Sequence, residues 1–194
     1  RDPHGPFTVL VAGGSQGARS INTAVIDMLA HIDTPAALRL IHQCGRDDLE
    51  RVRRAYAAAG INARVAAFFN DMEQQYAEAD LVVCRAGATT VAELTCVGIP
   101  AIFIPFPHAA DNHQEINARA VVSADAGELI VESELDGRGL WQRIQRLRND
   151  PDRLEAMARR ARALRRPEAA AVIVADIITH VLEPAPQKRP AAEE

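Results

Sequence analysis

The chain has few cysteines, and they form no pairing pattern. Cys44, Cys84 and Cys96 are odd in number and contain no C-x-x-C motif, which argues against a disulfide framework and against a thiolate zinc site. Each lies in an apolar stretch, so we expect three small buried side chains in a reducing compartment. Long apolar runs are also missing. The longest, such as residues 100–106, are far below the roughly 18 residues that a membrane-spanning helix needs.

Several functional signatures are absent as well. The glycine-rich stretch 13–18 has neither GxGxxG nor GxxxxGK[ST] spacing, which excludes the Rossmann dinucleotide fingerprint and the P-loop. It also lacks the GxSxG spacing of a nucleophile elbow. The net charge of −4 argues against non-specific binding to nucleic acid. No signal peptide is recognisable.

The ends of the chain predict a piece of a longer protein. No methionine opens the sequence, and the first strand pattern begins at Phe7, so we expect residues 1–6 to be the remains of a linker. Residues 183–194 are rich in proline, alanine and charge, and we expect a disordered tail there. Residues 7–182 are left for a single domain.

Strand-like and helix-like patterns alternate along that domain. Short apolar runs predict strands at 7–12, 38–43, 64–69, 81–84, 101–106 and 128–131. Apolar residues at helical spacing predict helices at 18–31, 47–59, 72–79, 90–97, 114–123, 139–149, 151–164 and 168–182. About six strands separated by helices predict an α/β fold, a Rossmann-like doubly wound parallel sheet with a helical C-terminal extension.

In such sheets a ligand binds beyond the carboxyl ends of the strands, near the point where the strand order reverses. The first unusual strand end is the loop 13–18. Its glycines allow close approach of the backbone, and free N–H groups at a helix start attract an anion. The loop's candidate ligand-binding residues are Gly14, Ser15, Gln16 and Gly17. A tight turn without a ligand accounts for the same residues nearly as well.

The second strand end is the segment 85–93. It enters a helix through small residues and two hydroxyls, and its candidates are Arg85, Gly87, Ala88, Thr89 and Thr90. Glu93 follows one turn later, where its carboxylate can accept both hydroxyls of a ribose. The alternative makes Glu93 a capping residue of the first helical turn. Two phosphate-ready loops in one sheet favour the ligand-binding interpretation.

The third strand end is the polar run 105–117. Gln114 and Asn117, one helical turn apart, project from the same face and could read sugar hydroxyls. Asp111 and Asn112 suit a turn and a helix cap, which is the competing interpretation of this run.

Two further groups of polar and charged residues are conspicuous along the chain. His108, Asp111 and His113 match no standard helical spacing of metal ligands, so we expect no metal site. Arginines gather between Arg138 and Arg166. They predict solvated helix faces or, as the alternative, a surface that meets another domain or anionic lipid.

Five stretches of the chain resemble the C-terminal domain of MurG-type UDP-N-acetylglucosamine transferases, which are GT-B glycosyltransferases of family 28. They are GGSQGA (13–18), FFNDM (68–72), VCRAGATTVAEL (83–94), GIPAIFIPFPH (98–108) and HQEINA (113–118). They occur in the family's order and span most of residues 7–182. The resemblance implies a domain that forms the C-terminal, donor-binding half of a two-domain enzyme.

The resemblance also implies roles for single residues. Ser15 would contact the diphosphate, the backbone of Phe69 would hydrogen-bond uracil, and Glu93 would hold the ribose hydroxyls. The phosphate and the sugar would be lined by Ala88, Thr89 and Thr90. Gln114 and Asn117 would read the N-acetylglucosamine, while Arg85 would orient its loop.

The implied reaction is an inverting transfer of N-acetylglucosamine to undecaprenyl-diphospho-N-acetylmuramoyl-pentapeptide. It needs no metal at the donor site and no cofactor, and it takes place on the cytoplasmic face of the cell membrane, with peripheral contact to anionic lipid. The lipid-linked acceptor and the general base would belong to the missing N-terminal half. We therefore expect this chain to bind UDP-N-acetylglucosamine without turning it over.

Three alternatives stay open. A diacylglycerol glycosyltransferase would keep the same site with another donor or acceptor. A non-hydrolysing UDP-N-acetylglucosamine epimerase would need catalytic acids on this half. A non-catalytic nucleotide-sugar-binding module would need neither an acceptor nor a base.

Overall fold

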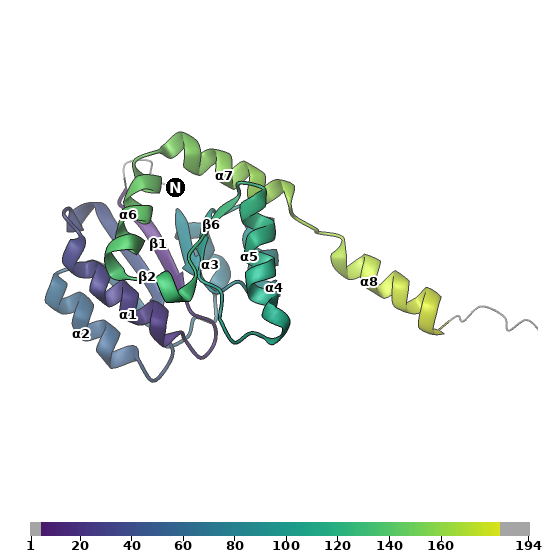
Figure 1. The fold of residues 1–194 in the computed structure, drawn as a ribbon, viewed down its shortest axis with the longest axis horizontal. Helices are drawn as coiled ribbons and strands as arrows, with labels where there is room; N and C mark the ends of the chain where they lie inside the picture. Colours follow the sequence, from purple (N-terminus) through teal and green to yellow (C-terminus); the bar gives the residue numbers. More distant parts are fainter. Residues whose placement is uncertain (1–4, 183–194) are drawn as a thin grey trace, which may run out of the picture.

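Six parallel strands form one sheet in the computed structural model of the chain, which describes residues 5–182 (Figure 1). In sequence the strands are β1 (Phe7–Ala12), β2 (Leu38–Gln43), β3 (Ala63–Ala66), β4 (Leu81–Cys84), β5 (Ala101–Phe103) and β6 (Gly127–Leu129). Their order in the sheet is β3-β2-β1-β4-β5-β6, and every neighbouring pair is parallel. The doubly wound fold predicted from the sequence is confirmed. The expected tail 183–194 and residues 1–4 of the expected linker lie outside the described residues.

The strand order reverses between β1 and β4. The chain builds outward from β1 through β2 to β3, then returns to the other side of β1 and continues through β5 to β6. In this register Ala12, the last residue of β1, faces Gln43 of β2 and Cys84 of β4. The loops after these three strands therefore start side by side at one edge of the sheet.

Helices cover both faces of the sheet (Figure 1). One face carries α1 (Arg19–Met28), α2 (Leu49–Ala59) and α6 (Gly137–Arg148), and the other carries α3 (Met72–Glu78), α4 (Ala88–Val97) and α5 (His113–Ser123). Alternation along β1 supplies both cores: Val9 and Val11 belong to the first, Leu10 to the second. Burial of each such side chain stabilises the folded state by about 1.5–3 kcal/mol relative to leaving it exposed.

Several element boundaries differ from those predicted. The strands predicted at 64–69, 101–106 and 128–131 end earlier, at Ala66, Phe103 and Leu129. The apolar residues continue past these points, but each strand ends where the neighbouring strand no longer offers a residue to pair with. Phe103, for example, pairs with Cys84, the last residue of β4. The helix predicted from Thr90 begins two residues earlier, at Ala88.

The prediction of three buried cysteines is wrong for one of them. Cys44 and Cys84 are buried, and burial raises the pKa of both thiols, whereas Cys96 is exposed. Leu94 and Thr95 take the inward face of α4. Cys96 borders a groove of about 360 Å³ that is lined by α4, α5 and the segment that joins α7 to α8.

Three arginines of the arginine-rich segment gather around one acid. Glu128 of β6 is 6% exposed and forms ion pairs with Arg143, Arg146 and Arg153, at 3.1, 3.5 and 2.9 Å. Arg143 and Arg146 lie on α6, and Arg153 on α7 (Pro151–Ala163), so one carboxylate joins two helices to the sheet. These three arginines keep partly exposed side chains but have a structural role, which the sequence pattern did not predict.

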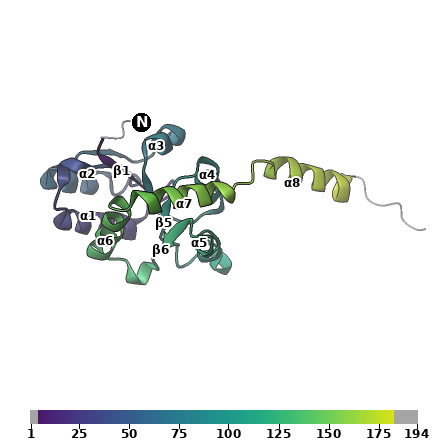
Figure 2. The same cartoon turned by 90° about the horizontal axis from the view of Figure 1, so that it is seen from above.

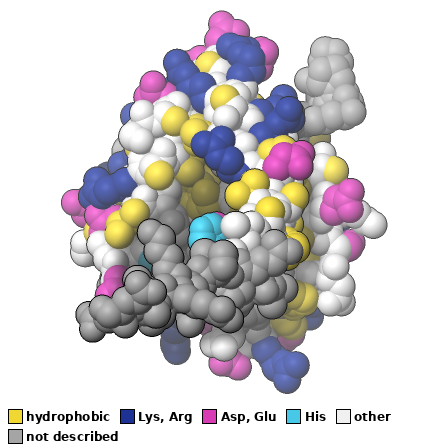
Figure 3. All heavy atoms as spheres, turned by 90° about the vertical axis from the view of Figure 1, so that its right-hand side faces the viewer, with side chains coloured by type: hydrophobic (Ala, Val, Ile, Leu, Met, Phe, Trp, Pro, Cys, Tyr) yellow, Lys and Arg dark blue, Asp and Glu magenta, His cyan; other side chains and the backbone are white. Residues whose placement is uncertain are grey.

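The last helix stands apart from the domain. Figures 1 and 2 show α7 leading to α8 (Ala169–Ile177), which lies outside the layered part of the molecule and continues as a π-helical turn, Ile178–Leu182. Its apolar side chains Val172, Ile173 and Val174 are 63%, 59% and 56% exposed. Figure 3 looks onto this end of the molecule and shows hydrophobic side chains open on the surface among charged ones. None of the helices in residues 5–182 combines the length and the apolar composition of a membrane span.

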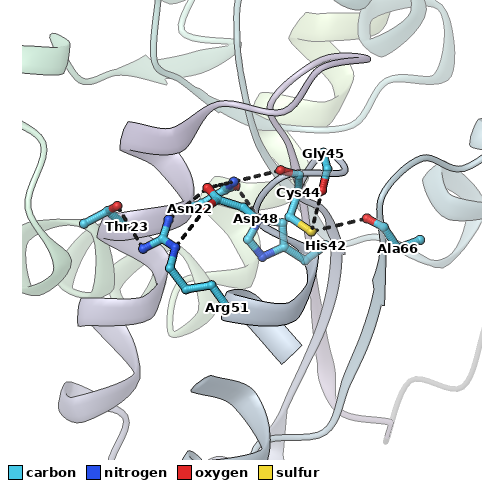
Figure 4. A network of polar contacts seen from close by, with 8 residues as sticks. All are labelled: Asn22, Thr23, His42, Cys44, Gly45, Asp48, Arg51 and Ala66. Atoms are coloured by element: carbon cyan, nitrogen blue, oxygen red, sulfur yellow. Dashed lines mark hydrogen bonds and ion pairs between the residues drawn. The ribbon is translucent and has the colours of Figure 1, made fainter. Parts of the chain in front are cut away.

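A buried polar network joins α1, β2 and α2 (Figure 4). The amide nitrogen of Asn22 donates to the Cys44 carbonyl (2.8 Å) and to Asp48 (2.7 Å), which leaves its oxygen to accept from His42 Nε2 (2.9 Å). His42 Nδ1 then accepts from the Tyr56 hydroxyl (2.9 Å). Both ring nitrogens are satisfied by a neutral imidazole. Burial lowers the pKa of His42 from 6.5 to about 3.

This network predicts acid sensitivity. Because the folded-state pKa of His42 lies below the unfolded value, the unfolded chain binds the extra proton between pH 6.5 and 3. Stability from this group is complete above pH 6.5 and falls with pH, by up to about 1.4 kcal/mol per pH unit. When the free energy of unfolding in urea is measured from pH 7 to 4.5, it should fall less steeply with decreasing pH in His42→Gln than in the parent chain. The exposed His108→Gln should keep the parental slope, and an equal slope for His42→Gln would contradict the prediction.

The acid between α6 and α7 can be tested by comparing two glutamates. Glu128→Gln should lower the free energy of unfolding by about 1–3 kcal/mol, because three guanidinium groups lose their shared counter-charge. Glu155 forms an exposed ion pair with Arg159, one helical turn away, so Glu155→Gln should cost less than about 0.5 kcal/mol. Chemical denaturation measures both. Similar losses for the two variants would show that Glu128 does not join the helices.

Candidate functional site

The helices that start at the carboxyl edge of the sheet have uncapped N-termini where the two predicted loops end. The N-cap residues Ala18 of α1 and Gly87 of α4 provide no side-chain cap. The starts of α2, α3 and α5 also lack a side-chain cap, whereas Asp136 caps α6 through the Gly139 N–H (2.8 Å), and Asp150 caps α7. The first N–H groups of α1 and α4 are therefore left for an outside acceptor, which favours an anion.

The loop after β1 is a tight turn that only glycine permits at its end. The Gly17 N–H donates to the Gly14 carbonyl (3.1 Å), and the turn presents Gly14, Ser15 and Gln16 to solvent. Gly17 has φ +79°, and a Cβ there would lie 2.1 Å from the carbonyl oxygen of Cys44. The loop is pressed against the chain that leaves β2, which holds its exposed tip in place.

The loop after β4 has more space. A Cβ on Gly87 would meet only Thr90 Oγ1, at 3.9 Å, so the glycine leaves the loop open rather than filling a packed position. Ala88 and Thr89 are exposed in the first turn of α4. Within residues 5–182 the hydroxyls of Thr89 and Thr90 form no hydrogen bond, which leaves both available to a ligand.

Glu93 lies in the second turn of α4. Because the helix begins at Ala88, Glu93 is its sixth residue, and the alternative of a first-turn capping residue is wrong. The side chain is exposed, and its Oε2 accepts a hydrogen bond from the Tyr76 hydroxyl (2.8 Å). The acid is thus held on the same helix as the open loop, on its solvent side.

The side chain of Arg85 is held by contacts within the protein. Its guanidinium donates to the carbonyls of Ile104 and Pro105 (both 3.0 Å), pairs with Glu132 (2.5 Å) and lies 5.4 Å from the ring centre of Phe106. These contacts tie the loop after β4 to the end of β5. They fit the predicted role of orienting the loop and leave little of the guanidinium for a ligand.

Gln114 and Asn117 point toward the same loop, as their spacing predicts. Gln114 Oε1 accepts from the N–H groups of Ala86 (3.3 Å) and Phe106 (3.0 Å), and Asn117 Nδ2 donates to the Ala86 carbonyl (3.1 Å). Both side chains hold the backbone just before Gly87. In the described part of the chain, the Gln114 nitrogen and the Asn117 oxygen keep no partner, so each can still contact a ligand.

Phe69 is linked to the loop after β1 by a residue that the sequence pattern did not single out. The Phe69 N–H donates to Gln43 Oε1 (2.9 Å), and Gln43 Nε2 donates to the Gly14 carbonyl (3.0 Å). Gln43 is buried at the end of β2, and an amide side chain at the carboxyl end of a predicted strand was the available signal. Since the Phe69 N–H already donates to Gln43, the Phe69 carbonyl is the backbone group left to contact a nucleobase.

The polar run before α5 forms the turn of the competing interpretation, but its predicted helix cap is wrong, because Asn112 at the N-cap of α5 makes no side-chain capping hydrogen bond. Asp111 and Asn112 have φ +49° and +54°, the left-handed region that these two residue types tolerate. Asn112 precedes α5 and donates to Glu115 (2.9 Å). His108 packs edge-on against the ring of Phe106. Among residues 5–182 no three His, Cys, Asp or Glu side chains are grouped to hold a metal ion.

Comparison with known proteins identifies the family to which this domain belongs. A family model described as the glycosyltransferase family 28 C-terminal domain matches residues 8–173. The UDP-N-acetylglucosamine–N-acetylmuramyl-(pentapeptide) pyrophosphoryl-undecaprenol N-acetylglucosamine transferase of Myxococcus xanthus is 51% identical over 168 residues, which cover 86% of this chain and 44% of the relative. The transferase of the same name from Geobacter sp. is 47% identical, over 89% of this chain and 47% of the relative.

A solved structure agrees with the sequence relatives. The crystal structure of Acinetobacter baumannii MurG superimposes with a TM-score of 0.84 at 34% identity, covering 92% of this chain and 54% of that one. The chain thus spans about half the length of the proteins it matches. The match of the family model over most of the sequence shows that this chain belongs to the glycosyltransferase family 28 C-terminal domain family.

Proposed function

We propose that this chain is the donor-binding half of a UDP-N-acetylglucosamine transferase that glycosylates undecaprenyl-diphospho-N-acetylmuramoyl-pentapeptide. The observation that carries the proposal is the pair of uncapped helix starts, α1 and α4, on neighbouring strands β1 and β4, with Glu93 one turn further along. One pyrophosphate can accept from both helix starts, and the acid can accept from a ribose. The names of the Myxococcus and Geobacter relatives support this donor and acceptor.

The proposed donor lies across the carboxyl edge of the sheet. The uracil contacts the Phe69 backbone, Glu93 holds the ribose, and the loop Gly14–Gly17 with Gly87–Thr90 surrounds the diphosphate. Gln114 and Asn117 use their unpaired amide atoms on the N-acetylglucosamine. Neither a metal ion nor a cofactor is needed for this arrangement, because backbone N–H groups face the diphosphate.

The proposed chemistry is an inverting displacement. An acceptor hydroxyl attacks the anomeric carbon, the bond to the diphosphate breaks, and UDP leaves with the added negative charge. Fixed N–H donors at the two helix starts stabilise that charge, and each well-placed donor contributes about 2.7–4 kcal/mol. Tight anchoring of the loops through Gly17, Gln43 and Arg85 favours this role, since the donors need no rearrangement as charge develops.

The acceptor side belongs to the part of the protein beyond this chain. We propose that an N-terminal half binds the lipid-linked acceptor, supplies the general base and contacts anionic lipid on the cytoplasmic face of the cell membrane. The proportion of the relatives that this chain matches, 44% and 47%, is consistent with one of two halves.

Substitution of Glu93 tests the proposed nucleotide site. Glu93→Gln should weaken UDP binding by at least about tenfold, because hydrogen bonds to a charged group contribute about 1.5–3 kcal/mol. Isothermal titration calorimetry compares it with Glu50→Gln, an exposed residue of α2 on the other face of the sheet, which should bind like the parent. Equal UDP affinity in all three proteins would remove Glu93 from the site. Competition among UDP-sugars would separate an N-acetylglucosamine donor from the hexose donor of a diacylglycerol glycosyltransferase.

The division of labour is tested by activity. This chain alone should bind UDP-N-acetylglucosamine but form no product from lipid-linked acceptor, because it provides donor contacts and no acceptor half. Transfer of radiolabelled N-acetylglucosamine measures this, with the full-length Myxococcus relative as the positive control. Product at the full-length rate would show that the chain contains a complete active site.

A further inference from the structure

The acid proposed for the ribose is held by a tyrosine from another helix. Tyr76 of α3 donates its hydroxyl hydrogen to Glu93 Oε2 over 2.8 Å, and 17 residues separate the two in sequence. Within the described residues Glu93 Oε1 has no hydrogen-bond partner, so this bond engages one carboxylate oxygen and leaves the other toward solvent. The tyrosine takes no part in the donor contacts proposed above.

Packing makes Tyr76 a firm support. The residue is 6% exposed and belongs to the same apolar cluster as Phe69, Leu94 and Ile99. Burial, together with the neighbouring Glu93 carboxylate, raises the pKa of the Tyr76 hydroxyl, so it remains a donor at neutral pH. The ring is fixed by the core, while its hydroxyl reaches the exposed acid.

This support addresses the weakness of an exposed glutamate. A free glutamate side chain on a helix surface samples many rotamers, and ordering it against a ligand costs free energy. A bond from a fixed hydroxyl removes part of that freedom before the ligand arrives. Because α3 directly follows the segment that contains Phe69, the same helix links the predicted base contact to the ribose acid.

We propose that Tyr76 is a positioning residue that orients Glu93 toward the 2′ and 3′ hydroxyls and thereby makes the site selective for ribonucleotides over 2′-deoxyribonucleotides. The inference rests on the proposed nucleotide site and adds its specificity. An oriented carboxylate accepts from two neighbouring hydroxyls at once, whereas a 2′-deoxyribose offers it only one.

The test is the ratio of two affinities. Calorimetry gives the dissociation constants of UDP and 2′-deoxy-UDP for the parent chain and for Tyr76→Phe, which keeps the ring and removes one hydroxyl. The parent should prefer UDP by about tenfold or more, and Tyr76→Phe should reduce that preference by a factor of about 3 to 10, the contribution of one hydrogen bond. The ratio isolates the ribose, because a general loss of folding or of phosphate contacts weakens both ligands equally.

The chain's other tyrosine is a matched control. Tyr56 is also buried, and its hydroxyl donates to His42 in the core beneath α2. Tyr56→Phe should lower the melting temperature but keep the parental preference for UDP. In Glu93→Gln, adding Tyr76→Phe should change the preference no further, because the tyrosine acts through the acid.

The outcomes separate the two proposals. No UDP binding by the folded parent chain would overturn the nucleotide site itself. UDP binding with an unchanged preference in Tyr76→Phe would overturn the role of Tyr76 and leave the site standing. A parent chain that binds both nucleotides equally would likewise overturn the inference, since no ribose selectivity would exist for Tyr76 to support.

Discussion

The parallel pairing of β1 with β4 is the constraint on which the rest of the site depends. The pairing brings together strand ends that are 72 residues apart, Ala12 and Cys84, so the loops that lead into α1 and α4 leave the sheet from neighbouring positions. A single helix start holds an anion weakly in water, and in the proposed function both helix starts act on one diphosphate. Every other feature of the site keeps these two loops in position or extends their reach along a ligand.

Several polar side chains at this edge form hydrogen bonds within the protein itself. Gln43 joins the loop after β1 to Phe69, Arg85 joins the loop after β4 to the end of β5, and Gln114 with Asn117 holds Ala86 from both sides. Preorganised donors are more effective than mobile ones, because no reorganisation is needed when charge develops. The polar residues that the sequence marks as ligand contacts are therefore also the framework of the loops.

Two polar clusters away from that edge stabilise the layers. His42 and Asn22 connect α1, β2 and α2 beneath the first loop, and Glu128 connects β6 to α6 and α7. Each is satisfied by several partners, as buried polar groups must be to avoid a desolvation cost. Their presence explains residues that carry no ligand role, including Arg143, Arg146 and Arg153 of the arginine-rich segment.

The sequence by itself determined the class of fold, the succession of strands and helices, and the loops that carry the site, because apolar periodicity and small-residue turns are local properties. It also indicated the family, through motifs written in consecutive residues. Only the tertiary structure decided where strands end, that Cys96 faces outward, and that Glu93 sits beyond the first turn of its helix. The bonds from Tyr76 to Glu93 and from Arg85 to Glu132 join residues on separate elements. Periodicity assigns a side chain to a face, whereas a hydrogen bond depends on distances of a few tenths of an ångström that the packing of whole layers sets.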